Sequence, residues 1–140
     1  MLNKNLINSK IGLIEEYIEE LKKILELDNK KILSDYTKLR TIERDFQLIV
    51  DEIIDINIYL IKENKFNPSS DFQSSFEILA KNNILPDSFA LKISPIVGLR
   101  NKIVHRYEDI DRKFFIEQVK KNYKDFLKYI KIINKYTNKK

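Results

Sequence analysis

The residues best suited to chemistry lie in one short segment of the chain, residues 100–107. His105 is the only histidine, and histidine is the side chain best able to exchange a proton near neutral pH. Arg100 carries a planar guanidinium whose N–H donors match the oxygens of a phosphate. Other polar side chains of the segment are Asn101, Lys102, Arg106 and Tyr107. Such a density of donors is unusual for a helix that faces a core.

These residue types suit cleavage of RNA without a metal ion. The ribose 2′-hydroxyl attacks the adjacent phosphate while a general base takes its proton. A guanidinium can stabilise the negative charge that grows on the phosphoryl oxygens. Because the chain has no cysteine and one histidine, we expect no metal site built from those residues, no thiolate nucleophile and no disulfide. No cofactor is expected.

Helical spacing limits how these side chains can meet. Asn101 and His105 are four residues apart and share a helix face. Arg100 and His105 are five apart, about 140° around an ideal helix, so they do not lie side by side. Either the long arginine reaches around the helix, or two copies of the segment meet across the axis of a homodimer.

The elements that position this segment are predicted to be helices. Apolar residues recur at spacings of three and four, and the chain has only 2 glycines and 3 prolines. Four long helices are expected over residues 5–27, 31 or 34 to 64, 86 to 105 or 106, and 109 or 112 to 136, with a short helix over 71–82. Pro95 and Gly98 predict a kink near Ser94. The fold is therefore expected to be all-α, a single domain over residues 1–140 built as an up-and-down bundle of four long helices plus one short one.

The longest predicted helix contains a heptad-like apolar stripe. Its members are Leu39, Ile42, Phe46, Ile49, Ile53, Ile56 and Leu60. A bundle core is favoured over a coiled-coil partner surface. Asp55, in the same helix, is a candidate supporting residue that orients Arg100 or balances an internal charge. The alternative is a solvated carboxylate, because Asp51 and Asp55 share a face.

Charge and hydropathy narrow the possible partners and location. The net charge of +5 permits a polyanionic partner without requiring one. Five lysines gather on one face of the last predicted helix, at Lys121, Lys124, Lys128, Lys131 and Lys135. They form either an ordinary solvated face or a track for the RNA backbone. No apolar stretch reaches the length of a membrane span or has the form of a signal peptide, so no membrane partner and a cytoplasmic location are expected.

Residues 98–111 resemble a known family. The stretch from Gly98 to Tyr107, followed by Glu-Asp-Ile-Asp, resembles the R-x4-H-x-Y signature of HEPN-domain proteins, in particular their HepT toxin branch. Residues 41–47 and 55–56 resemble the second-helix pattern of that branch, and residues 83–86 its linker before the motif helix. The resemblance covers about residues 35–115.

This resemblance implies a function and assigns roles. HepT-like proteins are homodimeric ribonucleases of toxin–antitoxin pairs, which act without a metal. A minimal nucleotidyltransferase neutralises them by transferring AMP to the motif tyrosine. Carried over, Arg100 stabilises the phosphate, His105 is the acid–base residue and Asn101 is the polar residue after the arginine. Tyr107 is the AMP acceptor. Glu43 and Arg44 also match the sequence pattern of the family's second helix.

A second hypothesis belongs to another class of protein. The chain could be a HEPN binding module with little or no nuclease activity, serving a nucleotidyltransferase as its partner or nucleotide-binding subunit. The presence of Arg100, His105 and Tyr107 together favours the enzyme, because a pure scaffold has no need of this trio.

Overall fold

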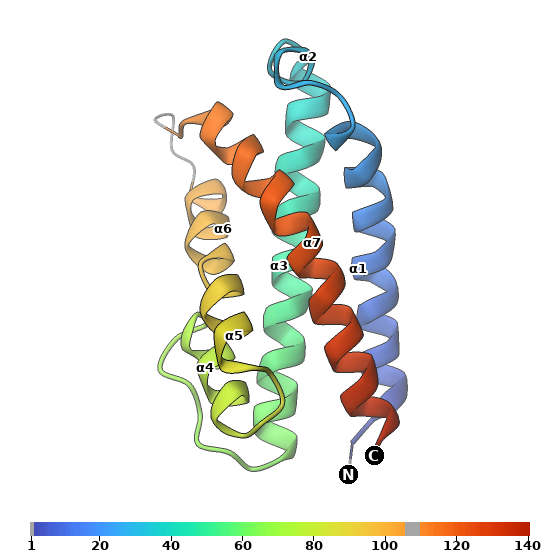
Figure 1. Cartoon of the computed structure of the whole chain (residues 1–140), viewed down its shortest axis with the longest axis vertical. Helices are drawn as coiled ribbons and strands as arrows, with labels where there is room; N and C mark the ends of the chain where they lie inside the picture. The colour runs from blue at the N-terminus through green and yellow to red at the C-terminus, as the bar shows by residue number, and fades with distance from the viewer. Residues whose placement is uncertain (1, 106–109) are drawn as a thin grey trace.

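The computed structural model describes residues 2–105 and 110–140, and all regular structure in these ranges is α-helical. The long helices are α1 (Lys4–Leu25), α3 (Tyr36–Glu63) and α7 (Arg112–Asn138). The shorter ones are α2 (Asn29–Leu33), α4 (Ser74–Lys81), α5 (Asp87–Ile93) and α6 (Ile96–Val104). In Figure 1 the chain runs up α1, down α3, up through α5 and α6, and down α7. The predicted all-α, up-and-down bundle is confirmed.

The three long helices begin at polar side chains that cap them. Asn3, Asp35 and Asp111 each lie at an N-cap and accept a hydrogen bond from the backbone N–H three residues further on. Such a bond satisfies one of the N–H groups that a helix leaves unpaired at its start. Side-chain chemistry thus fixes where each long helix starts.

The predicted fourth helix consists of two helices in the structure. The expected kink is a break, with α5 ending at Ile93 and α6 starting at Ile96. Pro95 has no backbone N–H to continue the hydrogen-bond ladder, which explains the interruption. The short helix α2 was not predicted; Asp28 caps it and Ile32 is fully buried. The candidate site therefore lies on a nine-residue helix that is separate from α5.

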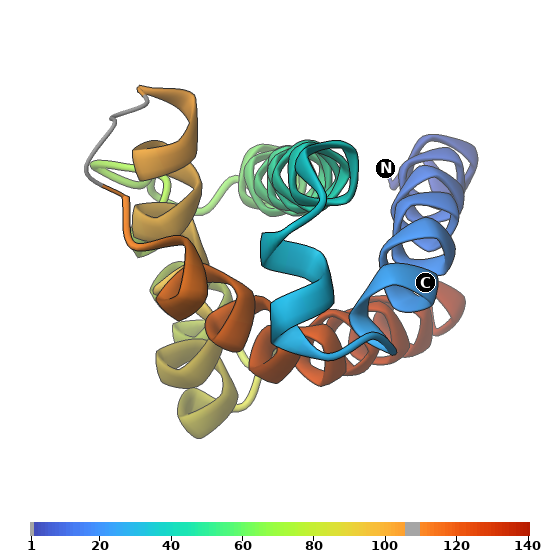
Figure 2. The same cartoon turned by 90° about the horizontal axis from the view of Figure 1, so that it is seen from above.

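The core is built around α3. All seven residues of its predicted apolar stripe are buried, so the prediction of a bundle core is confirmed. The Phe46 ring packs against the rings of Phe115 and Phe126, with centroids 5.5 Å and 5.9 Å away. Seen from above, α3 lies between α1 and α6 while α7 crosses below it (Figure 2). No other described helix covers the side of α3 opposite α7.

A buried chain of hydrogen bonds joins three helices. The Tyr129 hydroxyl of α7 donates to Asn57 Oδ1 of α3 at 2.6 Å. Asn57 Nδ2 donates to Ser75 Oγ of α4 at 3.0 Å, and Ser75 in turn donates to the Phe72 carbonyl. Burial raises the pKa of Tyr129, which keeps its hydroxyl protonated as a donor. These bonds satisfy polar groups that would otherwise be costly inside a core.

Within residues 2–105 and 110–140, no helix is both long and apolar enough to cross a bilayer.

Candidate active site

The helix α6 carries Arg100 and Asn101 and ends at His105. Ile96 and Val97 are buried on its inner face, and Leu99 and Ile103 pack against the core. His105 is the C-cap residue, and its backbone N–H donates to the Asn101 carbonyl at 3.0 Å. Its side chain is exposed. The helix end therefore presents His105 outward while the preceding turns anchor the segment.

Arg100 is held against α3. Its Nε donates to Asp51 Oδ1 at 2.8 Å, and only 19% of the arginine side chain is exposed. Its Nη1 donates to Asn101 Oδ1 at 3.0 Å. Charge-assisted bonds of this length orient a guanidinium as well as stabilise it. Arg100 thus has a defined direction before any substrate arrives.

Asn101, a predicted supporting residue, is in direct contact with Arg100. Because its side-chain oxygen accepts from the guanidinium, its amide group is turned to a fixed orientation. The structure therefore brings Asn101 together with Arg100, a contact that the shared face of Asn101 and His105 did not predict.

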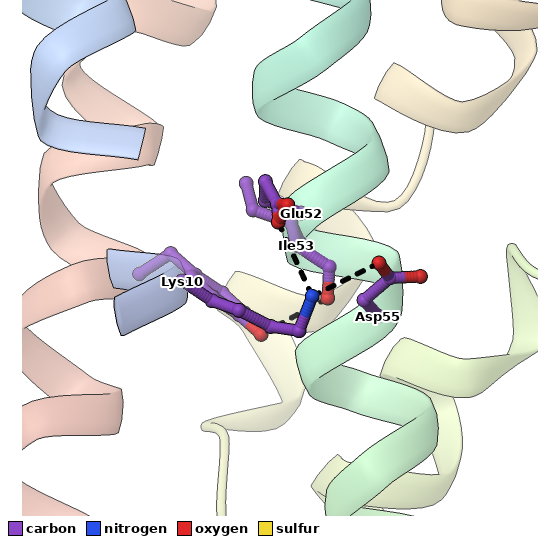
Figure 3. A network of polar contacts seen from close by, with 5 residues as sticks. Lys10, Glu52, Ile53 and Asp55 are labelled. Carbon is purple, nitrogen blue, oxygen red and sulfur yellow. Dashed lines mark hydrogen bonds and ion pairs between the residues drawn. The ribbon is translucent and has the colours of Figure 1, made fainter. Parts of the chain in front are cut away.

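Asp55, the other predicted supporting residue, does not contact Arg100. It accepts from Lys10 Nζ of α1 at 3.2 Å, and Glu52 lies 3.4 Å from the same nitrogen (Figure 3). Burial lowers the pKa of Lys10, but the hydrogen bond to Asp55 and the two carboxylate charges outweigh burial, so the pKa is raised. The prediction that Asp55 orients Arg100 is therefore wrong. Asp55 pairs with Lys10 and joins α1 to α3, while Asp51 binds Arg100.

Asp51 is the carboxylate that sequence reasoning passed over. It was recognised only as a neighbour of Asp55 on the same face. Asp51 and Asp55 are one helical turn apart. Which of the two carboxylates meets Arg100 depends on the position along α3 at which the separate helix α6 packs. The sequence indicates that Asp51 and Asp55 share a helix face. It does not indicate how α3 and α6 are displaced relative to each other along their axes.

His105 and Arg100 are separated along α6. Five residues correspond to about 7.5 Å of rise and about 140° of rotation. The Arg100 guanidinium is turned toward Asp51 and Asn101, whereas His105 follows the last residue of the helix. Tyr107, the predicted AMP acceptor, lies outside the described residues, as does Arg106.

A group of charged side chains lies at the upper end of α3, close to the start of α7. Glu43 is buried and lies 2.8 Å from Arg40 Nη1 and 3.6 Å from Arg112 Nε. Arg44 is largely exposed, and its Nη1 lies 3.8 Å from Asp45 Oδ1. Glu43 thus ties α3 to the first residue of α7.

Asp45 is fully buried on α3, and its oxygens have no hydrogen-bond partner within the described ranges. Burial, and next the nearby Glu20 carboxyl, raise its pKa from the usual 3.8 to about 7, although Arg44 acts in the opposite direction. The uncharged form of Asp45 is therefore favoured by the fold.

The site offers a proton-exchanging imidazole and a preoriented guanidinium on one short helix. These are the groups needed for attack at a phosphate with charge stabilisation in the transition state. Among the described side chains, no group of three or more His, Cys, Asp or Glu is placed to hold a metal ion.

This all-α bundle with an arginine and a histidine on a short motif helix matches a known class. Residues 14–133 match the profile of the family described as "Ribonuclease HepT-like". The chain belongs to the HepT-like ribonuclease family. The resemblance noted from residues 98–111, and the ribonuclease class it implies, are confirmed at the level of the family.

Curated relatives and solved structures agree with this assignment. A "tRNA nuclease HepT" of Aphanizomenon flos-aquae is 32% identical over 131 residues, covering 94% of this chain and 89% of the relative. An "mRNA nuclease HepT" of Shewanella oneidensis is 24% identical over 129 residues, covering 92% and 96%. Among solved structures, a tri-AMPylated Shewanella oneidensis HEPN toxin in complex with an MNT antitoxin superposes with a TM-score of 0.85 at 24% identity, covering 96% and 98%. That likeness shows the shared HEPN fold.

Proposed function

We propose that this protein, as a single HepT-like domain over residues 1–140, is a metal-independent endoribonuclease toxin of a toxin–antitoxin pair. The observation that carries the proposal is Arg100, fixed by Asp51 and Asn101 on the helix that ends at the exposed His105. Membership of a ribonuclease family supports it. The relatives named as tRNA and mRNA nucleases indicate RNA as the substrate class.

The reaction follows from the two side chains. An imidazole takes the proton of a ribose 2′-hydroxyl, whose oxygen forms a bond to the adjacent phosphorus. The bond from phosphorus to the 5′-oxygen breaks, and that oxygen gains a proton from an imidazolium. The products are a 2′,3′-cyclic phosphate and a free 5′-hydroxyl. The guanidinium of Arg100 stabilises the charge on the phosphoryl oxygens between these steps.

The active form in this proposal is a homodimer with composite sites. Arg100 of one protomer and His105 of its partner act on the same phosphate in this proposal, since residues five positions apart do not lie side by side on an ideal helix. Exposed apolar residues support a dimer face beside the ion pairs of α3. Leu6 and Leu13 flank Lys10 on α1, Ile58 follows Asp55 by three residues, and Val104 follows Arg100 by four. A second copy packed on this face would bring the two motifs together.

The antitoxin in this proposal is a minimal nucleotidyltransferase that modifies Tyr107. The Tyr107 oxygen attacks the α-phosphorus of ATP and loses its proton, and pyrophosphate leaves. The added AMP places a negative charge two residues from His105, which repels and blocks an RNA phosphate. The AMPylated state and the antitoxin complex of the Shewanella toxin support this part. We place this pair in the cytoplasm.

Expression of the wild type and of His105→Ala, with and without a co-expressed nucleotidyltransferase, tests the proposal. Wild type alone is expected to arrest growth and degrade RNA, whereas His105→Ala is expected to be harmless at equal protein levels. The purified proteins should differ in the same way on RNA in the presence of a chelator. Equal RNA breakdown by both proteins would remove His105 from catalysis. A harmless, inactive wild type would instead favour the non-catalytic binding module.

A further inference from the structure

The arginines of this chain are concentrated around the candidate site. Of its 26 basic residues, five are arginines, and all five lie within residues 40–44 and 100–112. The structure joins these two stretches, because Arg112 approaches Glu43 and Arg100 binds Asp51 on the same helix. Lysine supplies the positive charge elsewhere. Planar guanidiniums, which can contact a phosphate through two N–H donors, are therefore gathered in these two stretches.

A single buried carboxylate holds two of these guanidiniums. Glu43 Oε1 lies 2.8 Å from Arg40 Nη1, and its Oε2 lies 3.6 Å from Arg112 Nε. The Glu43 side chain is 11% exposed, whereas those of Arg40 and Arg112 are 51% and 40% exposed. One negative charge between two positive ones leaves a positive charge unbalanced. Glu43 thus accepts a hydrogen bond from Arg40 and lies within ion-pair distance of Arg112, without neutralising both.

Arg44 and Tyr36 extend this surface. The Arg44 side chain is 66% exposed, and its 3.8 Å approach to Asp45 is too long for a hydrogen bond. Arg40 lies over the Tyr36 ring at 4.9 Å from the centroid, and Tyr36 is exposed. An open aromatic ring beside guanidiniums is the arrangement on which single-stranded nucleic acids stack their bases.

The register of α3 connects this surface with Arg100. Arg40, Arg44 and Asp51 fall within about 40° of one another on an ideal helix. Arg44 precedes Asp51, the partner of Arg100, by seven residues, which is about 10 Å along the helix. A polyanion lying along this side of α3 would meet Arg40 and Arg44 and then reach Arg100.

We propose that Arg40, Arg44 and Arg112 bind phosphates of the RNA strand that flanks the cleavage point, with Tyr36 stacking a base and Glu43 as the positioning residue. This inference rests on the proposed ribonuclease function. RNA is favoured over an acidic protein because the surface combines forked donors with an exposed ring and adjoins the phosphate-directed Arg100.

Binding and cleavage of RNA by Arg44 variants test the inference. Affinity is measured by anisotropy on a fluorescein-labelled single-stranded RNA in a His105→Ala background, over a series of salt concentrations. Arg44→Ala is expected to weaken binding about tenfold and to reduce the slope of log affinity against log salt by about one. Arg44→Lys should restore part of the affinity. With His105 intact, Arg44→Ala should raise KM for RNA and leave kcat within about twofold.

Lys23→Ala is the matched control, since it removes one positive charge from an exposed site on α1. It should leave affinity and salt slope near those of the parent. An equal loss for Lys23→Ala overturns the inference, because the effect would then reflect overall charge. If the wild type cleaves RNA and Arg44→Ala binds RNA as tightly as the parent, the inference is overturned while the proposed function stands. Failure of every protein, wild type included, to bind RNA overturns the proposed function as well. Loss of the dimer or of antitoxin binding in Arg44→Ala, with RNA affinity kept, assigns the surface to a protein partner instead.

Discussion

A composite site can be tested by complementation between two inactive chains. In the proposed dimer, each site takes Arg100 from one protomer and His105 from its partner. A heterodimer of an Arg100→Ala chain with a His105→Ala chain then holds one site with both residues and one with neither. Each variant homodimer holds two sites that lack one residue.

The expected magnitudes follow from this geometry. Loss of the guanidinium or of the acid–base group should lower cleavage by each homodimer about 10²- to 10³-fold. The heterodimer, with one intact site of two, should recover about half of the wild-type kcat. Recovery is expected because the two residues lie five positions apart, about 7.5 Å along and about 140° around an ideal helix, and so do not lie side by side.

The assay uses heterodimers purified through two different affinity tags and initial rates on a labelled RNA. The matched control pairs a wild-type chain with a chain carrying both substitutions. Composite sites predict that this control is nearly inactive, whereas a site within one chain predicts about half activity for the control and none for the first heterodimer. The second pattern, or a monomer in sedimentation, would refute the reasoning.

Three further predictions concern particular contacts. Asp51→Asn should lower kcat for RNA cleavage about tenfold because Arg100 loses its charged partner, whereas Asp55→Asn should change it little; equal kinetic effects would contradict the assignment. Tyr129→Phe should destabilise the protein by about 1–3 kcal/mol in urea unfolding, because buried Asn57 Oδ1 loses its donor, and an unchanged midpoint would count against the network. Since folding raises the pKa of Asp45 from 3.8 to about 7, the unfolded chain releases this proton first, so the contribution of Asp45 to stability should fall as pH rises from about 4 to about 7. Asp45→Asn should therefore gain stability over wild type by up to about 4 kcal/mol across that range, and a pH-independent difference between them would exclude the buried proton.

Much of the fold could be predicted from the sequence because long amphipathic helices carry repeated signals. The apolar stripe of α3 spans several turns, and each turn repeats the same information about which side is buried. Pro95 marked the interruption between α5 and α6, since its missing N–H acts locally. The helix α2 was missed because its five residues include a single buried one, Ile32, and show no period.

The site was predictable only in part, for a different reason. Arg100, Asn101 and His105 lie in one segment, so their grouping is local and visible in the sequence. The contact of Arg100 with Asp51 spans 49 positions and depends on how two helices pack. Glu43, which holds both Arg40 and Arg112, likewise joins distant segments. Helical periodicity indicates the face of a residue but not its height relative to another helix.

The anchoring of Arg100 has a consequence for how tightly a phosphate can be held. A free arginine side chain loses rotamer freedom worth up to about 2 kcal/mol when it is immobilised. Asp51 and Asn101 impose most of that order during folding, so the loss does not recur when RNA arrives. The difference corresponds to about a tenfold or greater gain in affinity for a phosphate. The bond between Arg100 and Asp51 also attaches the short helix α6 to α3. A change that weakens this bond would therefore make the helix less stable and the binding of a phosphate by Arg100 weaker.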